Sequence, residues 1–354
     1  MKLSFPTING RGAGLGNELI PWARAFVAGT TLGVKTLPPA FGLNERKYRR
    51  HFGTPRLDWL THRLIEHVLP RYEFTEADFY KYSEKSLADT ILLFADEHKL
   101  AEKTAWVLTT QGMWGGYRHV LEARDFVRST LYLSKFAATN LATIKSRLNP
   151  NLITVGMHIR LGDFESEINV NNYRGKFNVS LPLQWYINIA HSIQQQLEDK
   201  VQFLIVSDGT KEQLAPLLNE CNAITTIDIP DSDISDMLAL ADADLLVCSV
   251  SSYSAWAAFL SNKPYLWFEP NLQKIDGYYS IWGHEPRQRM VDGFTMKARI
   301  EIEARNNGAL PRGLPVAMNG VIAQSYLSSI FKLQNSYQIA DDLVNYGVVN
   351  NSLL

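Results

Sequence analysis

Cysteine is scarce in this sequence, because Cys221 and Cys248 are the only two among 354 residues. Two thiols are too few for a disulfide framework or a cysteine-based zinc site, so we expect a reducing compartment. No stretch approaches the ~20 apolar residues that a membrane helix needs, which excludes an integral membrane segment. The chain begins by running into a glycine-rich loop and not into an apolar segment. We therefore predict a cytoplasmic protein that is at most peripheral to the membrane.

An excess of charge of one sign is also missing, because 35 basic and 36 acidic residues leave a net charge of -1. This balance gives no general attraction to nucleic acid or to anionic membranes, so any phosphate binding must be local. The densest basic run, residues 46–51, is expected to be a solvated or acceptor-side face more than a nucleic-acid site. A hydrophobic fraction of 46% is that of a globular protein, and 354 residues suggest two lobes with a cleft between them.

Several ligand motifs are incomplete or ambiguous. The loop from Gly10 to Asn17 lacks the Gly-Lys-Ser/Thr of a phosphate-binding P-loop, and Asn17 stands where a dinucleotide fingerprint has its third glycine. Asp242-Ala-Asp244 matches an Asp-x-Asp metal pair, but it lies between a predicted helix and the entry of a strand. We expect solvated turn carboxylates at that place and no metal site.

From Asn151 onward, strands and helices alternate with short connections, which is typical of a doubly wound parallel sheet. The pattern predicts strands over 152–159, 201–206, 224–229, 245–248 and 265–268. It predicts helices over 182–197, 211–220, 235–241 and 253–260. We interpret residues 151–285 as a Rossmann-like, nucleotide-sugar-binding lobe.

The flanking segments are less regular. Residues 1–150 begin with a weak strand over 3–8, a glycine loop and an apolar helix over 19–32. The tract 36–72 resembles a long functional loop more than core elements. We interpret 1–150 as an acceptor-side α/β lobe and 286–354 as a helical segment packing across the lobes.

The segment His158-Ile-Arg160-Leu-Gly-Asp163 follows a buried strand at its carboxyl end, where open α/β sheets bind ligands. Alternation would point His158 and Arg160 to one side, offering a ring donor and a five-donor fork to one anion. A guanidinium stays charged as a sugar leaves a diphosphate, so it can replace a metal ion. A structural ion pair between Arg160 and Asp163 explains these residues equally well.

A second constellation runs from Asp236 through a helix, a strand ending at Ser249, and a serine turn. Ser251 and Ser252 open the next predicted helix, where N–H groups and hydroxyls can bind an anion without lysine. The Asp236 carboxylate can accept both the ring N–H and the exocyclic amine of guanine, a donor pair that adenine lacks. Alternatively, the serines only cap the helix and Asp236 is simply exposed.

These motifs in this order resemble the donor lobe of the fucosyltransferase superfamily, whose members add α1,2-, α1,6- and protein O-linked fucose. The spacing from Asp236 to Ser252 is similar to that of the α1,6 enzymes. The glycine loop at 14–17 and the stretch 252–258 are similar to the α1,2 enzymes. The resemblance implies an α/β, two-lobed GT-B architecture whose C-terminal lobe is a Rossmann-like doubly wound parallel sheet.

The resemblance also implies roles for single residues. His158 would contact the nucleoside and Arg160 the diphosphate of a bound donor. Asp236 would contact guanine and Ser252 a phosphate oxygen. Asp208 resembles an acidic turn of the α1,2 enzymes, where it binds the donor or only shapes the loop.

The glycine loop is implied to line the cleft opposite the donor, where close backbone approach needs small residues. The predicted donor-binding residues are therefore His158, Arg160, Asp208, Asp236, Ser249, Ser251, Ser252, Gly14, Gly16 and Asn17.

The superfamily inverts the anomeric centre, which requires a general base on the acceptor hydroxyl. Arg160 is the predicted leaving-group stabiliser, and the candidate bases are Asp163, which is favoured, Glu165, Glu167 and Glu18. The family commonly has two adjacent arginines, and Leu161 stands in place of the second. This departure leaves the donor sugar open.

The predicted function is an inverting, metal-independent glycosyltransferase without a resident cofactor. It would move a sugar, L-fucose by resemblance, from a GDP-sugar to a glycan hydroxyl. The alternatives are transfer from another nucleotide-sugar, a catalytically inactive nucleotide- or glycan-binding protein of the same fold, and, least favoured, a nicotinamide dehydrogenase.

Overall fold

The computed structural model describes residues 1–8, 12–82, 85–114, 117–162, 165–166, 173, 179–261, 263–271, 273–275, 278–280, 313–332 and 349–350. These residues fall into two compact units. The first lies within Met1–Lys135, and the second lies within Phe136–His284 and Glu301–Leu354. Each unit contains its own parallel sheet, which confirms the predicted α/β fold class with parallel sheets.

The first unit has a four-stranded sheet in the order β2-β1-β4-β3, and its strand pairs are all parallel. The strands are β1 (Lys2–Pro6), β2 (Lys35–Thr36), β3 (Arg71–Glu73) and β4 (Trp106–Thr110). The helices are α1 (Leu15–Leu32), α2 (Arg49–Phe52), α3 (Asp58–Val68), α4 (Glu76–Tyr80), α5 (Leu87–Glu97) and α6 (Arg124–Tyr132), with 3-10 turns η1 (Phe41–Leu43), η2 (Leu100–Glu102) and η3 (Arg118–Ala123).

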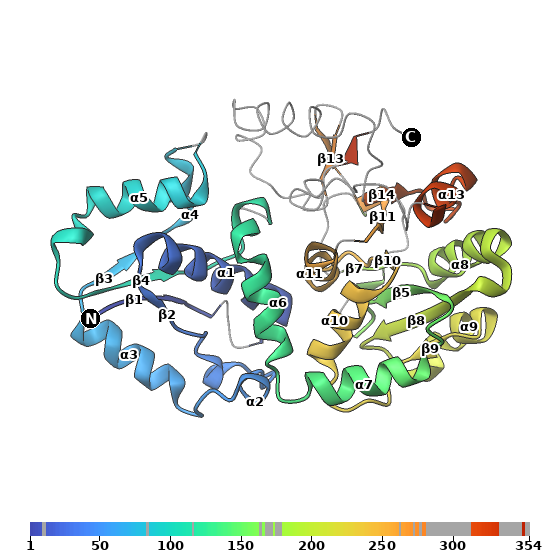
Figure 1. Cartoon of the computed structure of the whole chain (residues 1–354), viewed down its shortest axis with the longest axis horizontal. Helices are drawn as coiled ribbons and strands as arrows, with labels where there is room; N and C mark the ends of the chain where they lie inside the picture. The colour runs from blue at the N-terminus through green and yellow to red at the C-terminus, as the bar shows by residue number, and fades with distance from the viewer. Residues whose placement is uncertain are drawn as a thin grey trace. The chain divides into compact units, whose positions relative to one another are not determined.

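Alternation along β1 directs its side chains to two helical layers. The hydroxyl of Ser4 donates to the carbonyl of Ala25 in α1 at 2.9 Å. The ring of Phe5 lies 4.4 Å from the ring of His62 in α3, measured between centroids. Helices α1 and α3 therefore cover opposite faces of this sheet, as Figure 1 shows.

Helix α3 corrects the interpretation of 36–72 as a long loop. This helix and α2 both lie in that tract. In α3 and at its C-cap, Ile65 and Leu69 pack against the apolar cluster of the sheet, while Leu60 and Leu64 are exposed. Because the apolar residues are divided between two faces, the sequence lacks the single apolar stripe by which a surface helix is recognised.

The second unit has a six-stranded parallel sheet in the order β14-β11-β10-β5-β8-β9. Its strands are β5 (Ile153–Ile159), β8 (Val201–Ser207), β9 (Ile224–Thr225), β10 (Leu245–Val247), β11 (Tyr265–Phe268) and β14 (Gly313–Val316). The helices are α7 (Ala137–Arg147), α8 (Leu183–Leu197), α9 (Lys211–Cys221), α10 (Asp233–Asp242), α11 (Ser252–Leu260) and α13 (Gln324–Lys332). Shorter elements are β6 (Glu165–Ser166), β7 (Val179–Ser180), β12 (Gln273–Ile275), β13 (Tyr278–Ser280), β15 (Val349–Asn350), η5 (Glu198–Lys200) and η6 (Glu269–Asn271).

The predicted alternation of strands and helices over 151–285 is confirmed element by element. The largest difference is β9, which ends at Thr225 where the apolar pattern predicted a strand to 229. Strand β14 was not predicted: it lies in the segment 286–354, interpreted as helical, and pairs with β11 in the sheet. Helix α13 follows it, whereas much of the remaining segment lies outside the described residues.

Strand β5 occupies the centre of this sheet, and its alternate residues face different helices. Val155, Met157 and Ile159 belong to the buried apolar cluster that includes residues of α8 and α9. Gly156 faces α10, where a Cβ atom would lie 3.0 Å from Cδ2 of Leu240. Figure 1 shows α8 and α9 on one side of the sheet and α10 on the other. His158, two residues after Gly156, therefore faces the α10 and α11 layer at the carboxyl end of β5.

Within the described residues, no helix combines the length and the apolar character required to cross a bilayer.

Candidate active site

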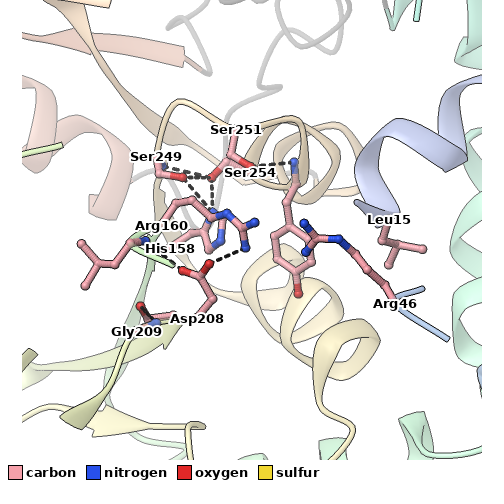
Figure 2. Close-up of polar contacts among 12 residues, drawn as sticks. Leu15, Arg46, His158, Arg160, Asp208, Gly209, Ser249, Ser251 and Ser254 are labelled. Carbon is pink, nitrogen blue, oxygen red and sulfur yellow. Dashed lines mark hydrogen bonds and ion pairs between the residues drawn. The ribbon is translucent and has the colours of Figure 1, made fainter. Parts of the chain in front are cut away.

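The candidate site lies in the second unit, at the carboxyl edge of its parallel sheet. Strands β5, β8 and β10 end there, and helices α10 and α11 begin there. This edge is where open α/β sheets bind ligands. The predicted residues His158, Arg160, Asp208, Ser249 and Ser251 converge on it, as Figure 2 shows.

His158 is buried and neutral. Only 4% of this residue is exposed to solvent. Its pKa is lowered from 6.5 to about 3, first because burial disfavours the charged ring and then because Arg160 repels that charge; Asp208 opposes the change. The ring of Tyr253 lies against it at 4.8 Å between centroids. The imidazole therefore stays uncharged across the physiological pH range.

Two serine hydroxyls contact Nδ1 of this imidazole. Nδ1 of His158 lies 2.6 Å from Oγ of Ser254 and 3.0 Å from Oγ of Ser249. Oγ of Ser254 already accepts the backbone N–H of Ser249 at 3.0 Å, so its own proton is available to donate to Nδ1. A neutral ring that accepts at Nδ1 carries its proton on Nε2. The described residues supply no hydrogen-bond partner to Nε2, so in the tautomer that is protonated there an N–H group is available to a ligand.

Arg160 is paired with Asp208, and the register of the sheet explains the pairing. Ile159 of β5 stands opposite Ser207 of β8, so the next residues of the two strands leave the sheet side by side. One amino group of Arg160 lies 2.6 Å from Oδ2 of Asp208, and 18% of the Arg160 side chain and 28% of the Asp208 side chain are exposed. Oδ1 of Asp208 accepts the backbone N–H of Leu161 at 2.8 Å. Asp208 thus orients the guanidinium and also holds the start of the loop that follows β5.

Gly162 completes this arrangement because the Asp208 carboxylate occupies the space beside its Cα atom. A Cβ atom at position 162 would overlap Oδ2 of Asp208. The predicted ion pair between Arg160 and Asp163 is not tested, since Asp163 lies outside the described residues.

The three predicted serines have different contacts. Ser249 is buried and contacts His158. Ser251 is the N-cap of α11, and its hydroxyl accepts the backbone N–H of Tyr253 at 3.2 Å. Ser252, the first residue of that helix, is half-buried. Capping is therefore confirmed for Ser251.

One interpretation of the sequence held that Asp236 is simply exposed. The structure instead buries it in the first turn of α10, with 6% of the residue exposed. Its Oδ2 accepts the hydroxyl of Ser232 at 2.7 Å, whereas its Oδ1 has no hydrogen-bond partner among the described residues. Burial raises the pKa of Asp236 from 3.8 to about 7, and Asp233 adds to this, while the hydroxyls of Ser232 and Thr226 oppose it.

Tyr253 connects this carboxylate region to the histidine. Its hydroxyl donates to the backbone carbonyl of Asp233 in the first turn of α10, and its ring contacts His158. The beginnings of α10 and α11 are thereby held together on one side of the site.

The predicted residues of the first unit lie at the start of α1. Gly14 is its N-cap and would meet nothing within 4 Å if it carried a Cβ atom, so the space beside it is open. Gly16 and Asn17 follow in the first turn. Glu18 is fully buried, and its carboxylate accepts the side-chain amide of Asn44 at 3.3 Å. This burial separates Glu18 from solvent, where a general base must meet an acceptor.

Of the other candidate bases, Asp163 and Glu167 lie outside the described residues, and for Glu165 the description is limited to its backbone in β6.

Asp244 lies at the opposite edge of the sheet, where its carboxylate accepts the backbone N–H of Thr154 at 2.9 Å and pairs with Lys263 at 3.4 Å. Within the described ranges, no group of three or more His, Cys, Asp and Glu side chains could hold a metal ion.

Ser254, Tyr253 and Tyr186 are the site residues that sequence reasoning missed. The hydroxyl of Tyr186 donates to the backbone carbonyl of His158 at 3.2 Å. All three lie in helices whose apolar pattern indicates core packing. Ser254 offered one signal, since it is a serine within the apolar segment Ser-Tyr-Ser-Ala-Trp-Ala-Ala and a fully buried hydroxyl needs a partner.

Residues 71–267 match the sequence profile of glycosyl transferase family 11, and because the match covers more than half of the chain, the chain belongs to this family. The match includes every predicted donor-site residue of the second unit, and it confirms the predicted resemblance to fucosyltransferases. No curated protein sequence matches the chain.

Among solved structures, the chain is similar to the fucosyltransferase NodZ from Bradyrhizobium, at 13% identity and a TM-score of 0.43, over 74% of this chain and 94% of NodZ. POFUT1 in complex with GDP-fucose has 10% identity and a TM-score of 0.41, over 74% of this chain and 95% of POFUT1. The ADP-heptose LPS heptosyltransferase II of E. coli has 13% identity and a TM-score of 0.36, over 75% of this chain and 84% of the heptosyltransferase.

Proposed function

As a member of glycosyl transferase family 11 the chain is a glycosyltransferase, and we propose that it transfers L-fucose from GDP-fucose to a glycan hydroxyl, with inversion and without a metal ion. The observation that carries the donor assignment is the convergence of a charged guanidinium, a neutral imidazole and a buried carboxylate at one sheet edge.

Arg160 is the proposed stabiliser of the departing diphosphate. Its charge persists throughout the reaction, and a planar fork can bind two phosphate oxygens at once. Before the donor arrives, Asp208 holds this fork at 2.6 Å, so the arginine needs little reorganisation to meet a phosphate. Preorganised positive charge of this kind lowers the barrier to leaving-group departure.

His158 is the proposed second donor to the nucleotide. Because its Nδ1 accepts from serine hydroxyls, its Nε2–H can donate to an oxygen of the nucleoside or of the diphosphate. Because the imidazole is neutral, it adds a hydrogen bond to the ligand without repelling the charged guanidinium of Arg160. The helix N-terminus at Ser251 and Ser252 supplies further N–H groups on the same side.

Asp236 is the proposed guanine reader. A buried acceptor without a partner is unfavourable, so its Oδ1 favours a ligand that brings N–H donors. Guanine offers two adjacent donors to a carboxylate, whereas uracil offers a single ring N–H. Ionisation of Asp236 then becomes coupled to nucleotide binding.

We propose Asp163 or Glu165 as the base that activates the acceptor, because both follow Arg160 closely in the chain. The burial of Glu18 makes it the weaker candidate. Leu161, in place of a second arginine, keeps transfer from another GDP-sugar as the alternative for the donor.

The decisive experiment measures GDP release from a panel of GDP-sugars, with and without acceptor sugars. We expect release from GDP-fucose that increases with a glycan acceptor and is retained in the presence of EDTA. In Arg160→Ala, kcat/KM should fall about 100- to 1,000-fold while the protein remains folded.

Arg147→Ala is the matched control, because Arg147 also pairs with an aspartate, Asp228 at 2.7 Å, but does so on the exposed surface. This variant should retain activity. Near-normal turnover in Arg160→Ala would reject the leaving-group role. Thermal stabilisation by UDP but not by GDP would reject the assignment of Asp236 to guanine, and GDP binding without any transfer would indicate an inactive binding protein.

A further inference from the structure

An unusual apolar surface lies on α3 in the first unit. The side chains of Leu57, Leu60, Leu64 and Val68 are 54%, 43%, 63% and 66% exposed. Ten large hydrophobic side chains are exposed among the described residues, and these four belong to one stretch of twelve residues. Single exposed leucines are ordinary on protein surfaces, but a group on one element indicates an interaction surface.

Helical geometry collects these four side chains into a single stripe. They follow one another at intervals of three and four residues, which is the spacing of one helix face. The opposite face packs against the sheet through Ile65 and through His62, whose ring lies 4.4 Å from that of Phe5. The helix is therefore already anchored by its inner face, and the outer stripe contributes nothing to the core.

The charges around the stripe are basic. Arg56 and Arg63 are exposed beside it, whereas of the two acidic residues of α3 one is buried and the other is half-buried. Asp58 is buried and accepts the backbone N–H of Gly42 at 2.8 Å. Glu66 is half-buried, with one carboxylate oxygen 3.9 Å from Arg71.

This local charge contrasts with that of the whole chain. Residues 46–71 contain seven Lys and Arg against two Asp and Glu, whereas the complete sequence has a net charge of -1. An apolar stripe flanked by arginines is the composition of a helix that lies in the interface of an anionic bilayer.

We propose that this face, which we call the α3 face and define by Leu57, Leu60, Leu64, Val68, Arg56 and Arg63, binds the surface of a membrane that contains anionic phospholipid. The leucines and the valine enter the boundary between headgroups and acyl chains, and the arginines contact lipid phosphates. A second copy of the chain fits this face less well, because pairing two such faces brings arginines of like charge together.

The test is co-sedimentation of the full chain with vesicles of phosphatidylcholine, with or without phosphatidylglycerol. The wild-type chain should bind the anionic vesicles, and binding should weaken with added salt. In the triple variant Leu60→Ser, Leu64→Ser and Val68→Ser, the partition coefficient should fall by roughly 100-fold or more, because three apolar side chains no longer leave water. In Arg56→Gln with Arg63→Gln, the preference for anionic vesicles should diminish by roughly tenfold or more.

Leu133→Ser is the matched control, because Leu133 is 80% exposed in the same unit but lies at the end of α6. Its binding should equal that of the wild type. Wild-type protein that stays in solution with anionic vesicles overturns the proposal, as does a triple variant that binds as well as the wild type. A dimer that the triple variant abolishes, together with no vesicle binding, would instead identify the face as a contact between copies. Because the substituted side chains are exposed, all variants should melt near the wild-type temperature, and GDP release without vesicles should be unchanged.

Discussion

Replacement of Asp236 by asparagine should make the empty protein more stable at pH 8 and at the same time weaken its binding of GDP. Asn keeps the size of the side chain and an oxygen that can accept the Ser232 hydroxyl. It removes the negative charge, which is buried in the wild-type chain with one oxygen unpartnered among the described residues.

The magnitude follows from the pKa of Asp236. Its rise from 3.8 to about 7 is worth about 4 kcal/mol of folding free energy, to be taken as an upper bound. Because the folded-state pKa lies above that of the unfolded chain, the folded chain holds more protons between these two pH values. Stability is therefore lost as pH rises through this window, and the full cost is present at pH 8. The neutral asparagine escapes that cost.

Urea unfolding at two pH values, without nucleotide, measures the effect. Asp236→Asn should exceed the wild type by up to about 4 kcal/mol at pH 8 and by less than half of that at pH 5, where the folded wild-type carboxyl is protonated. Asp233→Asn, an exposed neighbour in the same helical turn, should show no such pH-dependent gain. A variant that is less stable than the wild type at pH 8, or a difference that does not change with pH, would refute the reasoning.

The affinity for GDP should be lower in Asp236→Asn than in the wild type at pH 8, although the variant is the more stable protein. Between pH 6 and pH 8 the wild-type Kd should fall about tenfold more than that of Asp236→Asn, because only the wild type must ionise this carboxyl to bind guanine. Titration of the nucleotide phosphate affects both proteins equally and cancels in the comparison. Isothermal titration calorimetry provides both values, and equal pH profiles would contradict the proposed guanine contact.

Two further predictions concern buried polar groups. Ser254→Ala removes the donor to Nδ1 of His158 and leaves the backbone N–H of Ser249 unpartnered, so kcat/KM should fall roughly tenfold. Nitrogen NMR of the labelled histidine should then lose the pure Nε2–H signature, and Ser254→Thr should restore it; an unchanged signature would contradict the tautomer assignment. Arg24→Met should destabilise the first unit by about 3–5 kcal/mol, because the fully buried guanidinium of Arg24 donates to Thr110 and to the carbonyls of Gln111, Gly112 and Trp114. Arg147→Ala should cost less than about 1 kcal/mol in the same urea assay, and equal losses in the two variants would show that burial is not the cause.

The fold of the second unit was predictable because its elements are short, regular and separated by clear turn signals. The strand over 152–159 and the helix over 182–197 differ from β5 and α8 by one residue at one end. Helix α3 was not predictable, since its exposed stripe cancels the periodicity that indicates a buried face.

The gathering of His158, Arg160, Asp208, Ser249 and Ser251 at one sheet edge was predictable from the sequence, but the partners of their side chains were not. The register of β5 and β8 brings Asp208, 48 residues away along the chain, beside Arg160, and sequence proximity gave no sign of this partner. Likewise, the contact between His158 and Ser254 depends on the order of strands β10 and β5 in the sheet. Such contacts depend on tertiary structure, and a single sequence carries no record of them.

The close approach of Gly162 and Asp208 limits how this loop can evolve. Any residue other than glycine at position 162 would overlap the carboxylate that holds Arg160 and Leu161, so it can persist only with a smaller or displaced residue at position 208. Among relatives the two positions should therefore change together. Position 161 is restricted in a different way, because the Leu161 side chain packs against the apolar cluster of the second unit and lies beside Gly209. A second arginine at this position would have to give up that packing.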